Sequence, residues 1–275
     1  MVRKPVVAGK FYPENKEELF RQVRDLMPGE RPARKVVGAV VPHAGYVYSG
    51  GIAGRTFSEI LFPSTIVLLG PNHTGFGAPL AVFPSGFWET PLGKVRVDAS
   101  LTDEIVRTCP GAIADDRAHR FEHSLEVLVP FIQVRSPESS IVSICVGQNE
   151  FQELVNFGDA LGDLLVACSS DVLLVASSDM THFESAERAR KQDSMALKTI
   201  LDLDPEGLYR VVMKERISMC GVFPTVAMLC AALKMNASRG VLIQYGNSGE
   251  VTGEMNGVVG YAGVIVEKGA GEESL

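Results

Sequence analysis

Seven short runs of apolar and β-branched residues recur along the chain, and they restrict the fold more than any other feature of the sequence. Most of them are continuously apolar and do not alternate, which is typical of strands covered on both faces. The runs are Val36–Val41, Thr65–Leu69, Leu80–Phe83, Ile141–Val146, Val172–Ala176, Val241–Tyr245 and Val258–Val266.

Helical patterns separate these runs, and strands that alternate with helices predict an α/β fold. We expect a central, largely parallel or mixed β-sheet flanked by helices. The expected helices are Glu14–Met27, Gly51–Leu61, Ser124–Val134, Phe151–Cys168, Ser185–Leu203 and Val222–Leu233.

The stretch from 75 to 98 differs because it is rich in Gly and Pro. It predicts two or three short antiparallel strands, which form a small β-rich insertion near one edge of the sheet. No linker, repeat or low-complexity tract divides the sequence, so we expect one domain over residues 1–275. The tail, 268–275, is expected to be frayed.

Composition limits the classes of function. The chain holds 26 Lys plus Arg against 33 Asp plus Glu, a formal net charge of −7. Nucleic-acid-binding domains are usually basic, so we expect no nucleic-acid partner. No run approaches the roughly 20 apolar residues of a membrane-spanning helix, and no signal-peptide core is present, so we expect no membrane association. Five cysteines without a C-x-x-C pair predict a reducing, cytoplasmic location.

Three of the five histidines follow predicted strands at their carboxyl ends. His43 comes two residues after its strand, His73 four and His182 six. Ligands of open α/β sheets bind outside the carboxyl ends of the strands. If the three strands are parallel and adjacent, these side chains converge on one crevice. Imidazole is the commonest metal ligand and titrates near neutral pH, so the pattern predicts a metal site or a general-base site.

Cys220 stands immediately before the helix predicted from Val222. The positive end of a helix dipole lowers the pKa of a thiol and favours the thiolate, which is a nucleophile or a soft metal ligand. We therefore expect this cysteine to be functional. Cys145, Cys168 and Cys230 lie inside apolar runs and are expected to be small buried hydrophobic residues.

The segment from His119 to His123 matches H-x-x-E-H, the inverted zinc-peptidase pattern. That chemistry needs both histidines on one helical face, whereas the apolar period of the next helix begins only after His123. We expect His119 in a loop, and Glu122 and His123 beside the other histidines. Asp179 lies three residues before His182, where a carboxylate could orient that imidazole or bind a metal itself.

Seven segments occur in the order VAGKFYP, VPHAGYVYSG, LLGPNHTG, WETPLGKVRVD, EHSLEVLVPF, SSDMTHF and MCG. Together they resemble the Memo-like proteins, a family named after a mediator of cell motility in animals, over about Arg3 to Val266. The resemblance implies a fold like that of the class III extradiol dioxygenases, non-haem iron enzymes that cleave catechol rings with two histidines and a glutamate. It also implies a pocket in which a thiolate replaces the carboxylate, with the metal ligands His43, His73 and Cys220 and the further pocket residues Asp179 and His182.

Three functions are compatible with these residues. The first is a metal-dependent oxygenase or redox enzyme acting on a small, aromatic substrate, with Fe(II) or copper as the expected metal and zinc as the alternative. The second is a non-enzymatic module that holds a peptide, a small molecule or a metal in the same pocket. The third is metal-free nucleophilic catalysis by Cys220 with His182. The candidate catalytic residues are His182, Asp179, His123 and Glu122. The substrate, the native metal and the oligomeric state stay open.

Overall fold

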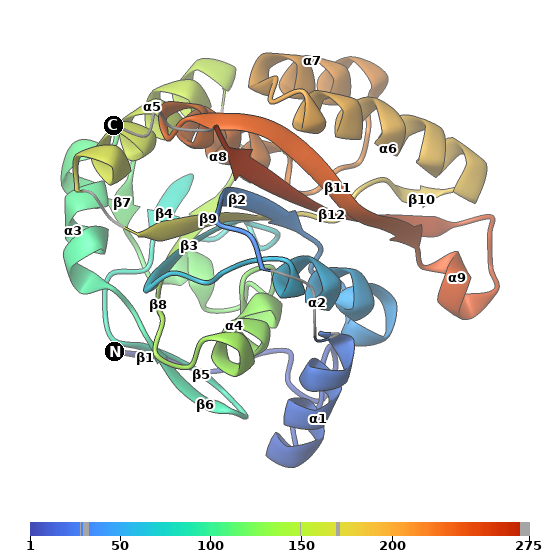
Figure 1. Cartoon of the computed structure of the whole chain (residues 1–275), viewed down its shortest axis with the longest axis horizontal. Helices are drawn as coiled ribbons and strands as arrows, with labels where there is room; N and C mark the ends of the chain where they lie inside the picture. The colour runs from blue at the N-terminus through green and yellow to red at the C-terminus, as the bar shows by residue number, and fades with distance from the viewer. Residues whose placement is uncertain (28, 30–32, 149, 169–170, 270–275) are drawn as a thin grey trace.

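A computed structural model describes residues 1–27, 29, 33–148, 150–168 and 171–269 of the chain. Nine of the described strands form one mixed sheet (Figure 1). They are β2 (Val36–Val41), β3 (Thr65–Pro71), β4 (Leu80–Val82), β7 (Ile113–Ala114), β8 (Ser140–Val146), β9 (Val172–Ser177), β10 (His182–Glu184), β11 (Ala237–Asn247) and β12 (Val258–Lys268). The predicted α/β fold with a mixed central sheet is confirmed.

The centre of the sheet consists of four parallel strands in the order β2-β9-β3-β8. β12 lies antiparallel to β2 on one side, and β4 lies antiparallel to β8 on the other. Every residue of the four central strands is buried, because both faces are covered, and this explains their continuously apolar sequences. The segments that follow β2, β9 and β3 therefore leave the sheet at the same edge.

Helices cover both faces of the sheet (Figure 1). A hydrophobic cluster lies under each helical layer. One layer contains α3 (Ala99–Thr108), α5 (Phe151–Ala167), α6 (Ala186–Leu201), α7 (Pro205–Glu215) and α8 (Val222–Lys234). The other layer contains α1 (Lys16–Leu26), α2 (Gly51–Ser58) and α4 (Val129–Arg135), and the short α9 (Gly249–Thr252) lies between β11 and β12 in sequence. Within the described part of the chain, no helix has the length and apolar character needed to span a bilayer.

The Gly- and Pro-rich stretch is organised differently from the expectation. β5 (Phe87–Thr90) and β6 (Gly93–Arg96) form the expected antiparallel hairpin, but β1 (Val2–Arg3) pairs with β5 to give a separate three-stranded sheet. β4 belongs to the main sheet instead of to this insertion. Of the expected frayed tail, Lys268 ends β12, while residues 270–275 lie outside the described residues.

Other local predictions differ in detail. The helix expected over Ser124–Val134 begins as a 3-10 turn at Glu126–Leu128 and continues as α4, and α3, α7 and α9 were not predicted. Cys145 and Cys230 are buried as expected. The prediction for Cys168 is wrong, because this residue follows the exposed Val166 and Ala167 at the end of α5 and is itself exposed.

Two glycines of α5 allow α8 to approach closely. A Cβ on Gly158 would lie 2.5 Å from the carbonyl oxygen of Ala227, and a Cβ on Gly162 would lie 2.6 Å from that of Ala231. These separations are shorter than van der Waals contact. A side chain at either position would push the two helices apart and disturb the larger hydrophobic cluster.

We expect Gly158→Ala to lower the free energy of unfolding by about 1–3 kcal/mol, because overpacking strains a tight core. Gly51→Ala is the matched control, since Gly51 is also helical and no atom lies within 4 Å of a Cβ placed there. The control should raise the free energy of unfolding by roughly 0.5–1 kcal/mol. Urea denaturation measures both changes, and an unchanged stability of Gly158→Ala would contradict the packing described.

Candidate metal centre

Three histidines from distant parts of the chain meet at the carboxyl edge of the central strands. His43 follows β2, His73 follows β3, and His123 lies between two 3-10 turns, η2 (Arg117–His119) and η3 (Glu126–Leu128). The ring centroids are 5.3 Å apart for His43 and His73, 5.6 Å for His43 and His123, and 4.8 Å for His73 and His123. Each ring offers one nitrogen such that all three atoms lie within 4.8 Å of one another, a separation suited to a single metal ion.

The ring of His43 is fixed by a chain of two hydrogen bonds. Ser177 Oγ, at the end of β9, lies 2.8 Å from His43 Nδ1 and 2.6 Å from the carbonyl oxygen of Ser124. A carbonyl only accepts, so the Ser177 hydroxyl donates to it and accepts the Nδ1–H of His43. Nε2 of His43 therefore carries no proton, and Cys220 Sγ lies 3.3 Å from its lone pair. Burial, followed by the charges of His73 and His123, lowers the pKa of His43 well below its usual value, so the ring is neutral as a metal ligand must be.

Glu122 anchors the other two histidines. Its Oε1 lies 2.9 Å from His73 Nδ1 and accepts the backbone N–H groups of His123 and Ser124, each at 2.9 Å. Its Oε2 accepts the backbone N–H of His73. Burial opposes ionisation of Glu122, but the hydrogen bond and charge of His73 outweigh burial and hold the pKa of the carboxyl at about 2. Pairing with a carboxylate orients histidine ligands in many metal sites.

The same carboxylate changes the pKa of His73. Burial lowers that pKa, but the hydrogen bond to Glu122 and its charge outweigh burial, so the pKa is raised overall. The pKa of His123 is lowered, chiefly by burial and against the charge of Glu122. Because His73 Nδ1 donates to Glu122, its Nε2 is the atom available to a metal, which must compete with a proton there.

Cys220 lies at one side of the three histidines. Its Sγ is 3.3 Å from His43 Nε2, but the cysteine is not among the side chains whose donor atoms all lie within 4.8 Å. As expected, it stands directly before Gly221, the N-cap of α8. Burial and the charge of Asp179 nevertheless raise the pKa of the thiol. The prediction that the helix dipole lowers this pKa is therefore wrong. A bound cation would favour the thiolate.

Asp179 and His182 both lie near the centre, with partners different from those expected. Asp179 Oδ1 accepts the backbone N–H of His43 at 2.8 Å, and burial raises the pKa of Asp179 to about 6 against that hydrogen bond and the charge of His182. His182 Nδ1 lies 2.7 Å from the carbonyl oxygen of Met180 and 2.9 Å from that of Ser218. Two backbone carbonyls therefore orient His182, in place of Asp179, and leave its Nε2 free.

The loop that carries Asp179 and His182 is held at each of its four backbone N–H groups. The acceptors come from three parts of the chain, namely α6, β12 and the segment before α8, which supplies two of them. They are Cys220 Sγ for Asp179 at 3.2 Å, the Gly260 carbonyl for Met180 at 2.9 Å, Asp193 Oδ1 for Thr181 at 2.9 Å and Ser218 Oγ for His182 at 2.7 Å. This loop is a rigid wall of the centre.

His119 belongs to a different environment. It is fully buried, its Nε2 lies 3.1 Å from the carbonyl oxygen of Ala81, and its Nδ1 lies 3.4 Å from Cys145 Sγ. Its ring packs edge-on against Phe83 and Trp88. The H-x-x-E-H pattern therefore divides between the core, which contains His119, and the candidate centre, which contains His123.

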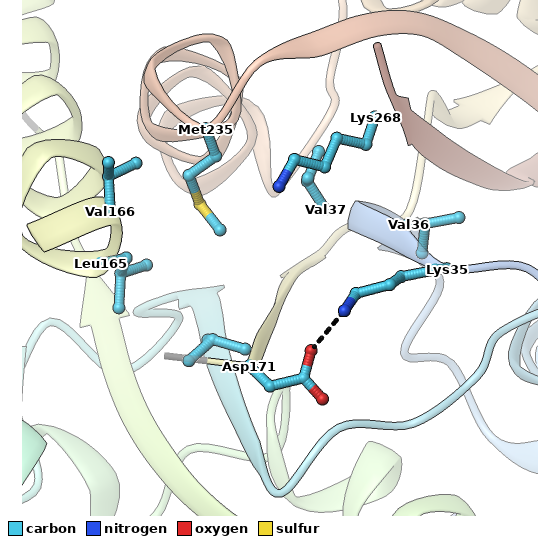
Figure 2. A pocket seen from close by; sticks show the side chains of 9 residues that line it. Lys35, Val36, Val37, Leu165, Val166, Asp171, Met235 and Lys268 are labelled. Carbon is cyan, nitrogen blue, oxygen red and sulfur yellow. Dashed lines mark ion pairs between the residues drawn. The ribbon is translucent and has the colours of Figure 1, made fainter. Parts of the chain in front are cut away.

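A separate hollow of about 290 Å³ lies at the opposite edge of the sheet, where β2 and β9 begin (Figure 2). Its walls include Val37, Leu165 and Met235, and Lys35 and Asp171 form an ion pair of 3.2 Å beside them. None of the histidines lines this hollow. Ligands of parallel sheets bind at the carboxyl edge, so we assign it no role in the chemistry of the centre.

Fold and site together define an α/β protein with a histidine-based candidate metal centre at the carboxyl edge of a mixed sheet. The family model of the Memo-like proteins matches residues 3–265, and the chain belongs to this family. A MEMO1 family protein of Methanosarcina mazei is 42% identical over 97% of this chain and 99% of its own length. One from Aquifex aeolicus is 43% identical over 96% of this chain and 98% of its own length.

The fold also resembles a solved structure. The uncharacterized protein JW3007 of Escherichia coli K12 has a TM-score of 0.59 and covers 84% of this chain and all of that chain, at 13% sequence identity. At this identity the likeness concerns the fold alone.

Acid should destabilise the protein through His119. Burial lowers the pKa of His119 to about 4, whereas the unfolded chain has a pKa of about 6.5. The unfolded state therefore takes up the proton first, so this contribution to stability is complete above pH 6.5 and is lost as the pH falls towards 4. Between pH 7 and pH 5 we expect a loss of about 2 kcal/mol from this group.

Urea denaturation of the wild type and of His119→Gln at both pH values measures this contribution. The variant lacks the titrating ring, so its stability should depend less on pH in this interval. An identical pH dependence in the two proteins would contradict the assignment.

Proposed function

We propose that this Memo-like protein binds one transition-metal ion at the histidine centre and uses it for oxygenase or redox chemistry on a small molecule. One observation supports this proposal most strongly. Three imidazoles, two of them with Nδ1 held by Ser177 and by Glu122, bring their donor atoms within 4.8 Å of one another. Rings oriented in this way need little rearrangement to bind an ion.

His43 and His73 belong to every ligand set that we consider. The third donor is His123 on the basis of the distances, or Cys220 on the basis of the family resemblance. Imidazole ligands suit iron, copper and zinc, and a thiolate would shift the preference towards copper or zinc. We therefore propose Fe(II) or copper, with zinc as the alternative. A bound ion would supply Lewis-acid or one-electron chemistry.

Two groups beside the centre are suited to moving protons. His182 presents a free Nε2, since its Nδ1–H is taken by backbone carbonyls. Asp179 has a pKa of about 6, which lets it exchange a proton near neutral pH. Glu122 is less suited to this task, because both its oxygens are already hydrogen-bonded and its pKa is about 2. We assign Glu122 an anchoring role.

A non-enzymatic binding module is the second candidate, and one observation favours it. Oxygenases with a facial triad use two histidines and a carboxylate. Here Glu122, the carboxylate beside His73, already accepts hydrogen bonds from His73 and Ser124. The group of three donor atoms found among the described residues contains only histidines. Metal-free catalysis by Cys220 is disfavoured, because the pKa of its thiol is raised.

Metal titration tests the ligand set. Untagged, metal-free protein is titrated anaerobically with Fe(II), Cu(I) and Zn(II), and elemental analysis counts bound ions. We expect one ion per chain, and we expect His43→Ala and His73→Ala to weaken its binding by more than about tenfold. His123→Ala and Cys220→Ser, compared with each other, identify the third donor.

Cys168→Ser is the matched control for the cysteine variant, because Cys168 is an exposed free thiol outside the centre. It should bind metal as the wild type does. Stoichiometric binding that survives the double substitution His43→Ala and His73→Ala would place the ion elsewhere.

A measurement of turnover distinguishes the proposed enzyme from the alternative, a non-enzymatic binding module. Metal-loaded protein is supplied with catechols and related phenols, and oxygen consumption is recorded. We expect consumption that requires both metal and substrate and that falls at least about 100-fold in His182→Gln, the size of a typical general acid–base contribution. Saturable binding of these compounds without oxygen consumption would favour the module instead.

A further inference from the structure

Two phenylalanines close in sequence to the centre are unusually exposed. Phe76 is 59% exposed and Phe121 is 66% exposed. Their rings form an edge-to-face pair with centroids 6.4 Å apart. With Gly77, Arg117 and Arg120 they line a hollow of about 240 Å³, which we call the Phe76–Phe121 cleft. Paired apolar side chains that line a hollow indicate a binding surface, unlike apolar residues exposed singly.

The segments that bring His73 and His123 to the centre also build this cleft. Phe76 follows His73 by three residues, and Phe121 precedes His123 by two. Asn72 closes the turn before Phe76: its Oδ1 accepts the N–H of Gly75 at 3.0 Å, and its Nδ2 donates to the carbonyl oxygen of Phe76 at 2.7 Å. The cleft and the centre therefore share their supporting backbone.

A buried carboxylate joins the two walls of the cleft. Asp115 accepts the backbone N–H of Ala78 at 3.0 Å from one wall and that of Arg117 at 2.8 Å from the other. Gly77 has a φ of +81°, and a Cβ there would lie 2.8 Å from the nitrogen of Ala118, so this close approach requires glycine. The cleft is thus pre-formed, which reduces the entropy lost on binding a ligand.

Both charged residues that line the cleft are already paired. Arg117 donates Nε–H and Nη2–H to Asp115 at 3.2 and 3.1 Å. Arg120 donates the same two groups to Asp116 at 3.2 and 3.1 Å. The lining therefore offers aromatic rings and neutralised guanidinium groups, a surface that favours an uncharged ligand over an anion.

We propose that the Phe76–Phe121 cleft binds an uncharged aromatic group of one or two rings. An engineered apolar cavity of about 150 Å³ binds benzene, so the present volume suits a single or a fused ring. The assignment of this aromatic group to the ligand of the histidine centre rests on the proposed function. Binding by the cleft itself does not depend on metal.

Saturation-transfer NMR with indole tests the cleft, first on metal-free and then on metal-loaded protein. We expect indole to bind with a dissociation constant in the millimolar range or tighter. Phe76→Ala, Phe121→Ala and the milder Phe121→Leu should each weaken binding at least fivefold. Phe20→Ala is the matched control, because Phe20 is an exposed phenylalanine on α1, and it should bind indole as the wild type does.

Equal indole binding by the wild type and the cleft variants would overturn the proposal, as would tighter binding of benzoate than of indole. Metal binding by the variants should equal that of the wild type, and a loss of metal would show that the cleft is not a separate subsite. Wild-type protein that binds indole but no metal would overturn the proposed function and leave the cleft intact.

Discussion

The buried carboxylate of Glu122 is the group on which the candidate centre depends. A charge in the interior is tolerated only when hydrogen bonds replace its hydration, and Glu122 receives them from His73, His123 and Ser124. These partners lie on two segments that are far apart in sequence. The carboxylate therefore joins the end of β3 to the loop before α4 and sets the tautomer of His73.

A second buried charge, on Arg3, also supports this loop. Arg3 forms an ion pair with Glu126 and donates to the carbonyl oxygens of His119 and Glu122. Glu126 also accepts the hydroxyl of Tyr12 at 2.6 Å. These contacts bind the N-terminal segment to the loop that carries His123. The resulting site is held by buried ionic contacts on a rigid sheet edge, an arrangement typical of pre-organised centres.

The strands and the first two histidines were predictable because their signals are local. Two of the continuous apolar runs correspond to β2 and β3, and a histidine follows each of these strands. The position of β9 between those strands, which brings Ser177 to His43, depends on tertiary pairing that no single stretch encodes. Burial likewise reversed the predicted shift in the pKa of Cys220. The start of α7 could have been found, since Asp204 caps it and proline takes its first position.

The anchored loop from Asp179 to His182 has a consequence for selectivity. Its four amides are held by three separate segments of the chain, so this side of the centre keeps its shape when a molecule binds. The turn that carries His73 is closed by hydrogen bonds of the Asn72 side chain with the backbone of Thr74, Gly75 and Phe76. With both segments held in this way, a molecule would have to match the existing outline of the centre, so discrimination between molecules would come from shape complementarity and not from induced fit.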